Sequence, residues 1–316
     1  MVVTKLVDLL KTARPRQWVK NLTLYAALVF NGYLFPQQIF SRDLVIVTQA
    51  VAAFTMVAIS IYFLNDVADI KADQSHPFKK KRPIAAGRVS VTEALVTAGL
   101  MATGGLWWAH ALSPLFFWTI LGYLMLQLLY SFWLKHVEVV DVFIIALGFF
   151  LRVLAGGIVI NVHLSIWFLL CVISTSLFLA VGKRRAELAI LTEQSQAILH
   201  RKVMGKYSPN ILDAYLSMFS TAAFLSWALY TFNFYEQGDL SSTPTALIMI
   251  SKTLTINKWL MATIPVVIFG IMRYIRIIYD GARAETPERV ILSDAPLLIS
   301  VATWGLAVIA VLYGGL

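Results

Sequence analysis

Three aspartates stand at helical spacing directly after the apolar stretch 44–64: Asp66, Asp69 and Asp73. A helix that continues through them places all three carboxylates on one face, since residues at these spacings are helix neighbours. Such carboxylates repel one another at a membrane boundary unless a cation neutralises them. Mg²⁺ suits these oxygen ligands, because it keeps several waters and takes further ligands from substrate phosphates. The spacing therefore predicts a Mg²⁺ site formed by the three aspartates.

Basic residues follow the aspartates closely. The segment 76–83 has the sequence His-Pro-Phe-Lys-Lys-Lys-Arg-Pro and contains Arg82. The alternative interpretation of the aspartates is a solvated helix end on which acids fall by chance, and this run of cations argues against it. Metal-binding acids beside cations form the arrangement that a diphosphate substrate requires. We therefore expect a phosphorylated substrate at this end of the helix.

The composition indicates which elements must position these residues. Of the 316 residues, 59% are hydrophobic and 14% are charged, against roughly 45–50% and about 25% in ordinary soluble chains. This composition excludes a soluble enzyme and a disordered chain, and the single cysteine, Cys171, can form no internal disulfide. The sequence predicts an integral membrane protein.

Nine stretches are apolar and long enough to cross a bilayer, which takes about 20 residues per helix. Gly104-Gly105 and Gly156-Gly157 fall inside two of them, where small residues permit close helix packing. Since the loops are short, the sequence predicts an all-α polytopic fold in which residues 1–316 form a single transmembrane domain. The expected spans are 20–38, 44–64, 91–111, 114–134, 139–160, 164–182, 211–234, 258–279 and 294–313.

The distribution of the 26 lysines and arginines orients this fold. Arg42, Lys252 and Lys258 lie on one side and Arg152 lies inside a span, whereas all the others lie on the opposite side, with the N-terminus. Because cytoplasmic loops are enriched in Lys and Arg, the N-terminus is predicted to be cytoplasmic and the C-terminus to lie outside. Topology and contacts with anionic lipids account for most of the net charge of +9, so no nucleic-acid partner is expected.

The aspartate motif also resembles that of a known family. Asn65-Asp66-x-x-Asp69-x-x-x-Asp73, followed by Arg-Pro-Ile-Ala-Ala-Gly at 82–87, is similar to the first signature of the UbiA superfamily of intramembrane prenyltransferases. The nine expected helices, with the motif after the second, fit that superfamily over nearly the whole chain. The resemblance implies a multi-pass protein of the cell membrane (inner or plasma membrane). Its bundle would hold a Mg²⁺-bound diphosphate at the cytoplasmic mouth and a lipid chain in a groove open to the bilayer.

A departure from the superfamily pattern indicates the branch. Most members carry a second aspartate-rich motif after the sixth helix, where this chain has Gly-Lys-Arg-Arg-Ala-Glu-Leu at 182–188. Basic residues favour a donor with additional phosphate, since Arg and Lys bind phosphate well. With the polar residues at 14–21, 130–135 and 141–152, the chain resembles the decaprenyl-phosphate phosphoribosyltransferase branch. That resemblance implies a glycosyltransferase that moves 5-phosphoribose from phosphoribosyl diphosphate to a polyprenyl phosphate, giving polyprenyl-phosphoryl-5-phosphoribose and diphosphate.

This interpretation assigns roles to individual residues. The three aspartates are predicted to be metal ligands and catalytic residues, and Lys183 and Arg184 to be further catalytic residues that clamp the donor's phosphates. Arg152 has a structural alternative as an ion-pair partner, and Tyr130 as an aromatic residue of the membrane interface. The predicted substrate-binding residues are Lys20, Asn21, Asn65, Arg82, Tyr130, Lys135, Asp141, Arg152 and Glu187.

Two alternative functions stay open. The first is a UbiA-type prenyltransferase that moves an isoprenoid from a prenyl diphosphate to an aromatic acceptor, although the basic cluster at 182–188 argues against it. The second is a transporter or channel, which would place charges near the membrane midplane in repeated halves, whereas here only Arg152 lies deep in a span. The sequence leaves open the isoprenoid length of the acceptor and whether the chain forms a homo-oligomer.

Overall fold

A computed structural model describes residues 2–31, 41–75, 79–193, 207–234, 256–279, 290–291 and 293–313 of the chain. Every regular element in these ranges is a helix, which confirms the all-α prediction. The chain divides into two compact units. Unit 1 comprises the described residues up to His163, and unit 2 comprises the described residues from Leu164 onward.

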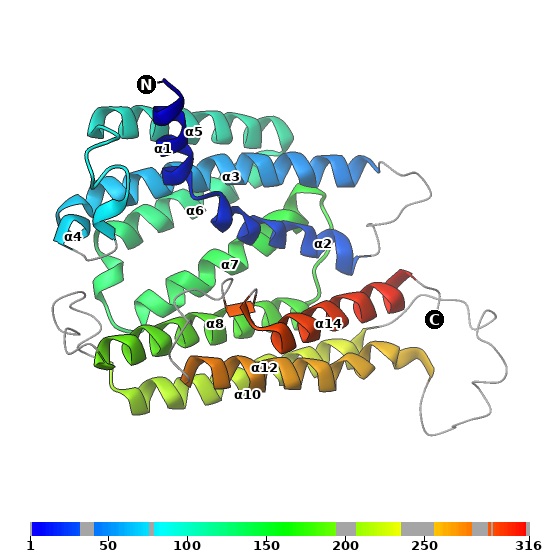
Figure 1. The fold of residues 1–316 in the computed structure, drawn as a ribbon. Coiled ribbons are helices and arrows are strands. Elements are labelled where there is room, and N and C mark those ends of the chain that lie inside the picture. The colour runs from blue at the N-terminus through cyan, green and yellow to red at the C-terminus, as the bar shows by residue number, and fades with distance from the viewer. Residues whose placement is uncertain are drawn as a thin grey trace. The chain divides into compact units, whose positions relative to one another are not determined.

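Unit 1 is built around the long helix α3, which packs along α5 and also contacts α6 and α7 (Figure 1). Its core contains Leu28, Phe54, Ile120 and Ala155, from four different helices. The helices of unit 1 are α1 (Val2–Ala13), η1 (Pro15–Leu24), α2 (Tyr25–Phe30), α3 (Arg42–Ala68), α4 (Ile70–Ser75), η2 (Lys79–Lys81), α5 (Val91–Leu112), α6 (Pro114–Phe132), η3 (Leu134–His136) and α7 (Val140–Val159).

Two of the glycines that lie inside expected spans, Gly156 and Gly105, show how closely the helices of unit 1 approach one another. A Cβ atom at Gly156 would clash with the carbonyl oxygen of Leu24, so α7 packs directly against the backbone of η1. A Cβ atom at Gly105 would lie 2.8 Å from the Val57 side chain and 2.9 Å from a backbone oxygen of α3. The small residues therefore permit close helix packing, as the sequence predicted.

Unit 2 consists of α8 (Ile166–Glu193), α10 (Pro209–Asn233), η5 (Ile256–Thr263), α12 (Ile264–Tyr279) and α14 (Ala295–Tyr313). Helix α8 packs along α10, and α12 packs against α14 (Figure 1). Asp294 precedes α14 and accepts hydrogen bonds from both Nε and Nη2 of Arg273, at 3.0 and 2.7 Å, and from the Leu297 N–H at 2.9 Å. The hydrogen bond from Arg273 holds the pKa of the Asp294 carboxyl below its usual value of 3.8.

Seven helical segments of the described chain are long and apolar enough to cross a membrane. They correspond to seven of the nine expected spans. The expected span 91–111 is present as the helix α5, which is not one of the seven. The expected span 20–38 contains the end of η1 and α2, and residues 32–40 lie outside the described ranges. The seven segments are Arg42–Ala68, Pro114–Phe132, Val140–Val159, Ile166–Leu188, Pro209–Asn233, Trp259–Tyr279 and Ala295–Tyr313.

Candidate active site

The three aspartates lie where α3 passes into α4. Helix α3 ends at Ala68, Asp69 is its C-cap, and α4 begins one residue later. The Asp69 N–H still donates to the Asn65 carbonyl at 2.9 Å, and the Asp73 N–H donates to the Asp69 carbonyl at 2.8 Å. The path is therefore helical but interrupted at Asp69, unlike the unbroken helix that the sequence predicted.

The interruption gives the carboxylates different surroundings. Asp66 and Asp73 are buried, with 2% and 3% of their surface exposed, and Nη1 of Arg82 donates to both, at 3.1 and 2.7 Å. The Asp69 side chain is 38% exposed and accepts from the Lys135 ammonium at 2.7 Å. The structure thus brings Arg82 and Lys135 against the aspartates, where both were predicted to bind substrate.

Arg14 is a further cation at this cluster, and it was not among the predicted site residues. Its guanidinium forms an ion pair with Asp66 and lies over the Tyr62 ring, 5.4 Å from the centroid. Its backbone is left-handed, with φ 53° and ψ 62°, a conformation that costs about 1–3 kcal/mol for such a residue. Pro15 follows it and disfavours the right-handed helical conformation there, so α1 ends and the arginine turns toward Asp66.

The end of α6 and the adjoining η3 contribute the rest of this cluster. Ser131 is buried and hydrogen-bonds to the Asn65 side-chain oxygen, which fixes that amide beside the aspartates. Tyr130, the preceding residue, is half-buried. Lys135 follows on η3 and reaches Asp69. Ser131 belongs to the segment 130–135 on which the resemblance rests, but it was not among the predicted site residues.

Arg152 is enclosed by neutral groups in the interior of unit 1. It is buried and donates to Asn21 Oδ1 at 3.0 Å, to the Gly148 carbonyl at 2.8 Å and to the Tyr123 hydroxyl at 2.7 Å. Its guanidinium also lies over the Tyr123 ring, 5.0 Å from the centroid. Asn21 is fully buried and donates to Thr55. These contacts favour a structural role for Arg152 and Asn21, although the partner differs from the ion pair considered above.

Two other predicted residues of unit 1 lie in separate surroundings. Lys20 is half-buried on η1, and its ammonium donates to the Gln17 side chain at 2.8 Å. Asp141 is buried in the first turn of α7, two residues after Val139, whose backbone φ of 63° is unusual for a β-branched residue. Each has further contacts of its own.

The basic cluster of unit 2 lies on α8. Arg184 is 1% exposed and donates to Glu187 at 2.6 Å, one turn along the same helix. Lys183 is half-buried. Arg185, which was not predicted as a site residue, donates to Asp213 of α10 at 2.6 Å and lies 4.7 Å from the centre of the Tyr279 ring. The acids that balance this basic cluster thus come partly from a distant segment of the sequence.

The donor set at the α3–α4 junction fits Mg²⁺. Among the described residues, no three His, Cys, Asp or Glu side chains are grouped so that they could hold a metal ion, and the three aspartates are therefore not gathered into one such group. Mg²⁺ does not require one, because it is usually bound through one or two carboxylates together with substrate phosphates. One cationic nitrogen, Nη1 of Arg82, already contacts both Asp66 and Asp73. These two carboxylates can therefore share a cation.

Comparison with known proteins identifies the family of the chain. The model of the UbiA prenyltransferase family matches residues 23–186. The chain belongs to the UbiA family. Among its relatives is a protein named decaprenyl-phosphate phosphoribosyltransferase from Mycolicibacterium smegmatis, to which the chain is 35% identical over 302 residues. The match covers 94% of this chain and 89% of the relative. A relative of the same name from Corynebacterium glutamicum is 34% identical over 309 residues, covering 96% and 86%.

Solved UbiA structures have the same fold. A UbiA homolog from Archaeoglobus fulgidus bound to GPP and Mg²⁺ matches with a TM-score of 0.66 and 20% identity, covering 96% of this chain and 99% of that one. A digeranylgeranylglyceryl phosphate synthase structure matches with a TM-score of 0.63 and 14% identity, covering 98% and 99%. The apolar helices and the family together identify a multi-pass membrane protein.

Proposed function

We propose that this UbiA-family protein is a phosphoribosyltransferase that moves 5-phosphoribose from phosphoribosyl diphosphate to a polyprenyl phosphate. The observation that carries this proposal is the similarity, over 94% of the chain, to a protein named decaprenyl-phosphate phosphoribosyltransferase. The charges on α8 support it, because Lys183, Arg184 and Arg185 suit a donor with more phosphate than a prenyl diphosphate has.

The topology is part of the proposal. We propose nine transmembrane helices, a cytoplasmic N-terminus, and a site that faces the cytoplasm at the cell membrane. The seven described apolar segments, the helical stretch 91–111 and the stretch 20–38 make up the nine. The lysines and arginines support the orientation. Since relatives match nearly the whole chain, we treat residues 1–316 as one UbiA-like domain.

The transfer requires one bond to break and one to form at the anomeric carbon of the ribose. Asp66 and Asp73, with Asp69, would hold Mg²⁺, which would neutralise the diphosphate leaving group. As the bond from carbon to diphosphate breaks, oxocarbenium character develops, and a phosphate oxygen of the lipid forms the new bond. That phosphate is already an anion, so a protein base is unnecessary. What the chain must supply is preorganised charge.

The cations of unit 1 are placed to supply that charge. Arg82 and Arg14 meet Asp66, and Lys135 meets Asp69. In this arrangement each cation neutralises a carboxylate. When the carboxylates bind metal, the cations would bind the donor's phosphates instead. Asn65, held by Ser131, would orient a polar group of the substrate.

The other predicted residues have supporting roles. In unit 2, Lys183 is proposed to bind a donor phosphate, and Glu187 holds Arg184 in place. Tyr130, Asp141 and Lys20 remain proposed contacts to substrate. Asn21 and Arg152 would act indirectly, by fixing η1 against α7.

The proposal is tested with purified protein, Mg²⁺ and one radiolabelled donor at a time. Labelled phosphoribosyl diphosphate with decaprenyl phosphate should move label into the organic phase, and labelled prenyl diphosphate with an aromatic acceptor should not. Transfer only in the second reaction would make the protein a prenyltransferase. Label in neither organic phase, from a preparation that retains its fold, would contradict the enzymatic assignment.

A further inference from the structure

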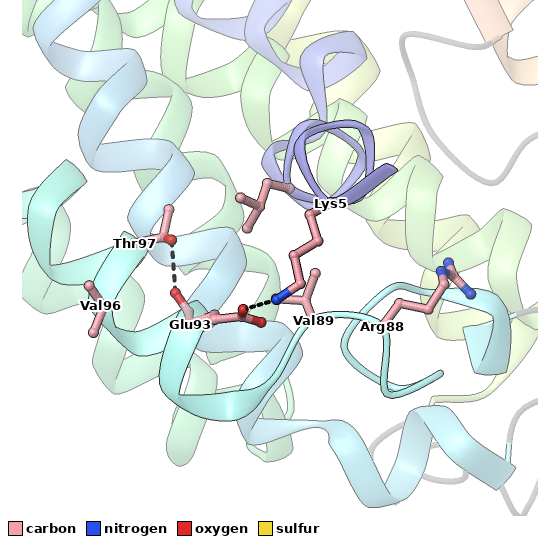
Figure 2. Close-up of a pocket in the computed structure, with 7 residues that line it drawn as sticks. Lys5, Arg88, Val89, Glu93, Val96 and Thr97 are labelled. Atoms are coloured by element: carbon pink, nitrogen blue, oxygen red, sulfur yellow. Dashed lines mark hydrogen bonds and ion pairs between the residues drawn. The ribbon is translucent and has the colours of Figure 1, made fainter. Parts of the chain in front are cut away.

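Unit 1 has a cavity between α1 and the start of α5 that the proposed reaction does not use. It lies between α1, the loop before α5 and the first turns of α5 and has a volume of about 170 Å³, which is less than the roughly 300–1,000 Å³ of sites that take a whole small molecule, so only part of a ligand, such as a headgroup phosphate, would enter it. Figure 2 shows Lys5 of α1 reaching to Glu93 at the start of α5, with Arg88 on the preceding loop. The lining residues are Lys5, Leu9, Arg88, Val89, Glu93, Val96 and Thr97.

Two cations stand at this cavity and have donors to spare. The Lys5 ammonium has three N–H groups, and its one described acceptor is Glu93 Oε1 at 2.5 Å. Arg88 uses Nε for Asp8 at 3.1 Å and Nη2 for the Lys81 carbonyl at 3.0 Å, and within the described ranges its Nη1 has no acceptor. An anion can therefore accept a hydrogen bond from either cation without displacing its carboxylate partner.

An exposed apolar stripe runs from the cavity along α5. Val96, Leu100 and Trp107 are 57%, 63% and 76% exposed, and their spacing, with Thr103 between the last two, keeps them on one helix face. From Glu93 to Trp107 the helix rises about 21 Å, more than half of the roughly 30 Å hydrocarbon core of a bilayer. An acyl chain can follow this stripe through one leaflet.

The outer face of α1 fits the surface of the same leaflet. Leu6, Val7 and Leu10 are exposed on one side of this helix, with Lys11 at its edge. Asp8 and Thr12 on the opposite side are buried against unit 1. An amphipathic helix of this kind lies in the membrane interface, where basic residues meet anionic headgroups.

The cavity is separate from the aspartate cluster. A buried apolar group lies between them, and it includes Ala13, Phe63 and Val89 as well as Leu9 on the cavity side. Val67, which follows Asp66 in the sequence, packs against the same group. A ligand in the cavity is therefore kept away from the reacting carboxylates.

We propose that this cavity binds an anionic phospholipid, with its phosphate between Lys5 and Arg88 and an acyl chain along Val96, Leu100 and Trp107. The occupant is a structural lipid of the membrane and not a substrate of the transfer, because the apolar group closes the cavity from the aspartates. The bound lipid would hold α1 against α5.

The test measures lipid retained by the full-length protein. Protein taken from vesicles of phosphatidylcholine and phosphatidylglycerol is examined by native mass spectrometry, and its melting temperature is followed as phosphatidylglycerol is titrated into phosphatidylcholine micelles. Wild-type protein should retain phosphatidylglycerol and be stabilised by it. Removing one cation near an anionic headgroup weakens binding about 5-fold, so Lys5→Gln with Arg88→Gln should weaken it roughly 25-fold.

A matched control separates the cavity from general attraction to a charged surface. Lys11→Gln removes a cation from the same helix outside the cavity, and it should leave the number of retained lipids unchanged. Val96→Glu places a carboxylate in the cavity wall and should abolish retention while Lys5 and Arg88 are still present. Equal losses in Lys11→Gln and Lys5→Gln, wild-type retention in Val96→Glu, or equal stabilisation by inorganic phosphate would overturn the proposal.

Discussion

Removing Asp66 should damage both folding and catalysis, whereas removing Asp69 should damage catalysis alone. Asp66 is buried and meets two cations, Arg14 and Arg82. Breaking a buried ion pair costs about 3–5 kcal/mol. Because these arginines are 27% and 30% exposed, they can turn toward water, and we expect Asp66→Ala to cost about 1–3 kcal/mol. The exposed pair of Asp69 with Lys135 should be worth about 0–1 kcal/mol.

Purified variants in detergent test this difference. A loss of about 2 kcal/mol corresponds to a melting temperature roughly 4–8 °C lower for Asp66→Ala, and Asp69→Ala should melt like the wild type. Both should lose nearly all Mg²⁺-dependent turnover. Asp43→Ala, which removes an acid from the first turn of the same helix, is the matched control and should keep its activity. Wild-type stability in Asp66→Ala would refute the structural part of this reasoning, and substantial turnover in Asp69→Ala would exclude Asp69 from the metal site.

Three further predictions concern other parts of the chain. Arg152→Lys should destabilise the protein by roughly 1–3 kcal/mol, because an ammonium cannot reproduce the forked contacts of the guanidinium. The donor KM should stay unchanged. A raised donor KM at normal stability would instead place Arg152 at the substrate. Lys183→Gln should raise the donor KM about 10-fold or more, and a wild-type donor KM in this variant would contradict the binding of a donor phosphate by Lys183. Arg184→Gln should chiefly lower the melting temperature, because Arg184 is buried. Since the folded-state pKa of Asp294 is lowered, its contribution to stability is present above the usual value of 3.8 and is lost as the pH falls through the folded-state pKa. Asp294→Asn should therefore lower stability at neutral pH and reduce the loss on acidification, as thermal unfolding at several pH values would show.

Local patterns in the sequence were enough to predict the helical fold and the place of the aspartates. The spacing of Asp66, Asp69 and Asp73 follows from helix periodicity, and the close contact at Gly156 follows from the small residue itself. The partners of Arg152 could not be predicted, since Asn21 and Tyr123 lie far away in the chain and are neutral. The same holds for Asp213, which meets Arg185 only because α8 and α10 pack together.

Arg14 shows a different limit of sequence reasoning. The pair Arg14-Pro15 indicates that a helix ends there, but it does not indicate which acid the arginine will reach. Which acid it reaches depends on how α1 packs against α3. The break at Asp69 is similar, because a helix that continues and a helix that is interrupted have the same residue spacing.

The mass of the lipid product tests the central proposal most directly. Purified protein is incubated with Mg²⁺, phosphoribosyl diphosphate and decaprenyl phosphate. The mass of the extracted lipid is then measured by mass spectrometry, and the released diphosphate is measured in the aqueous phase. The proposed reaction adds one phosphoribosyl group to each lipid and releases one diphosphate. Unmodified decaprenyl phosphate from a folded protein, together with a prenylated product when a prenyl diphosphate and an aromatic acceptor are supplied, would contradict the proposed function.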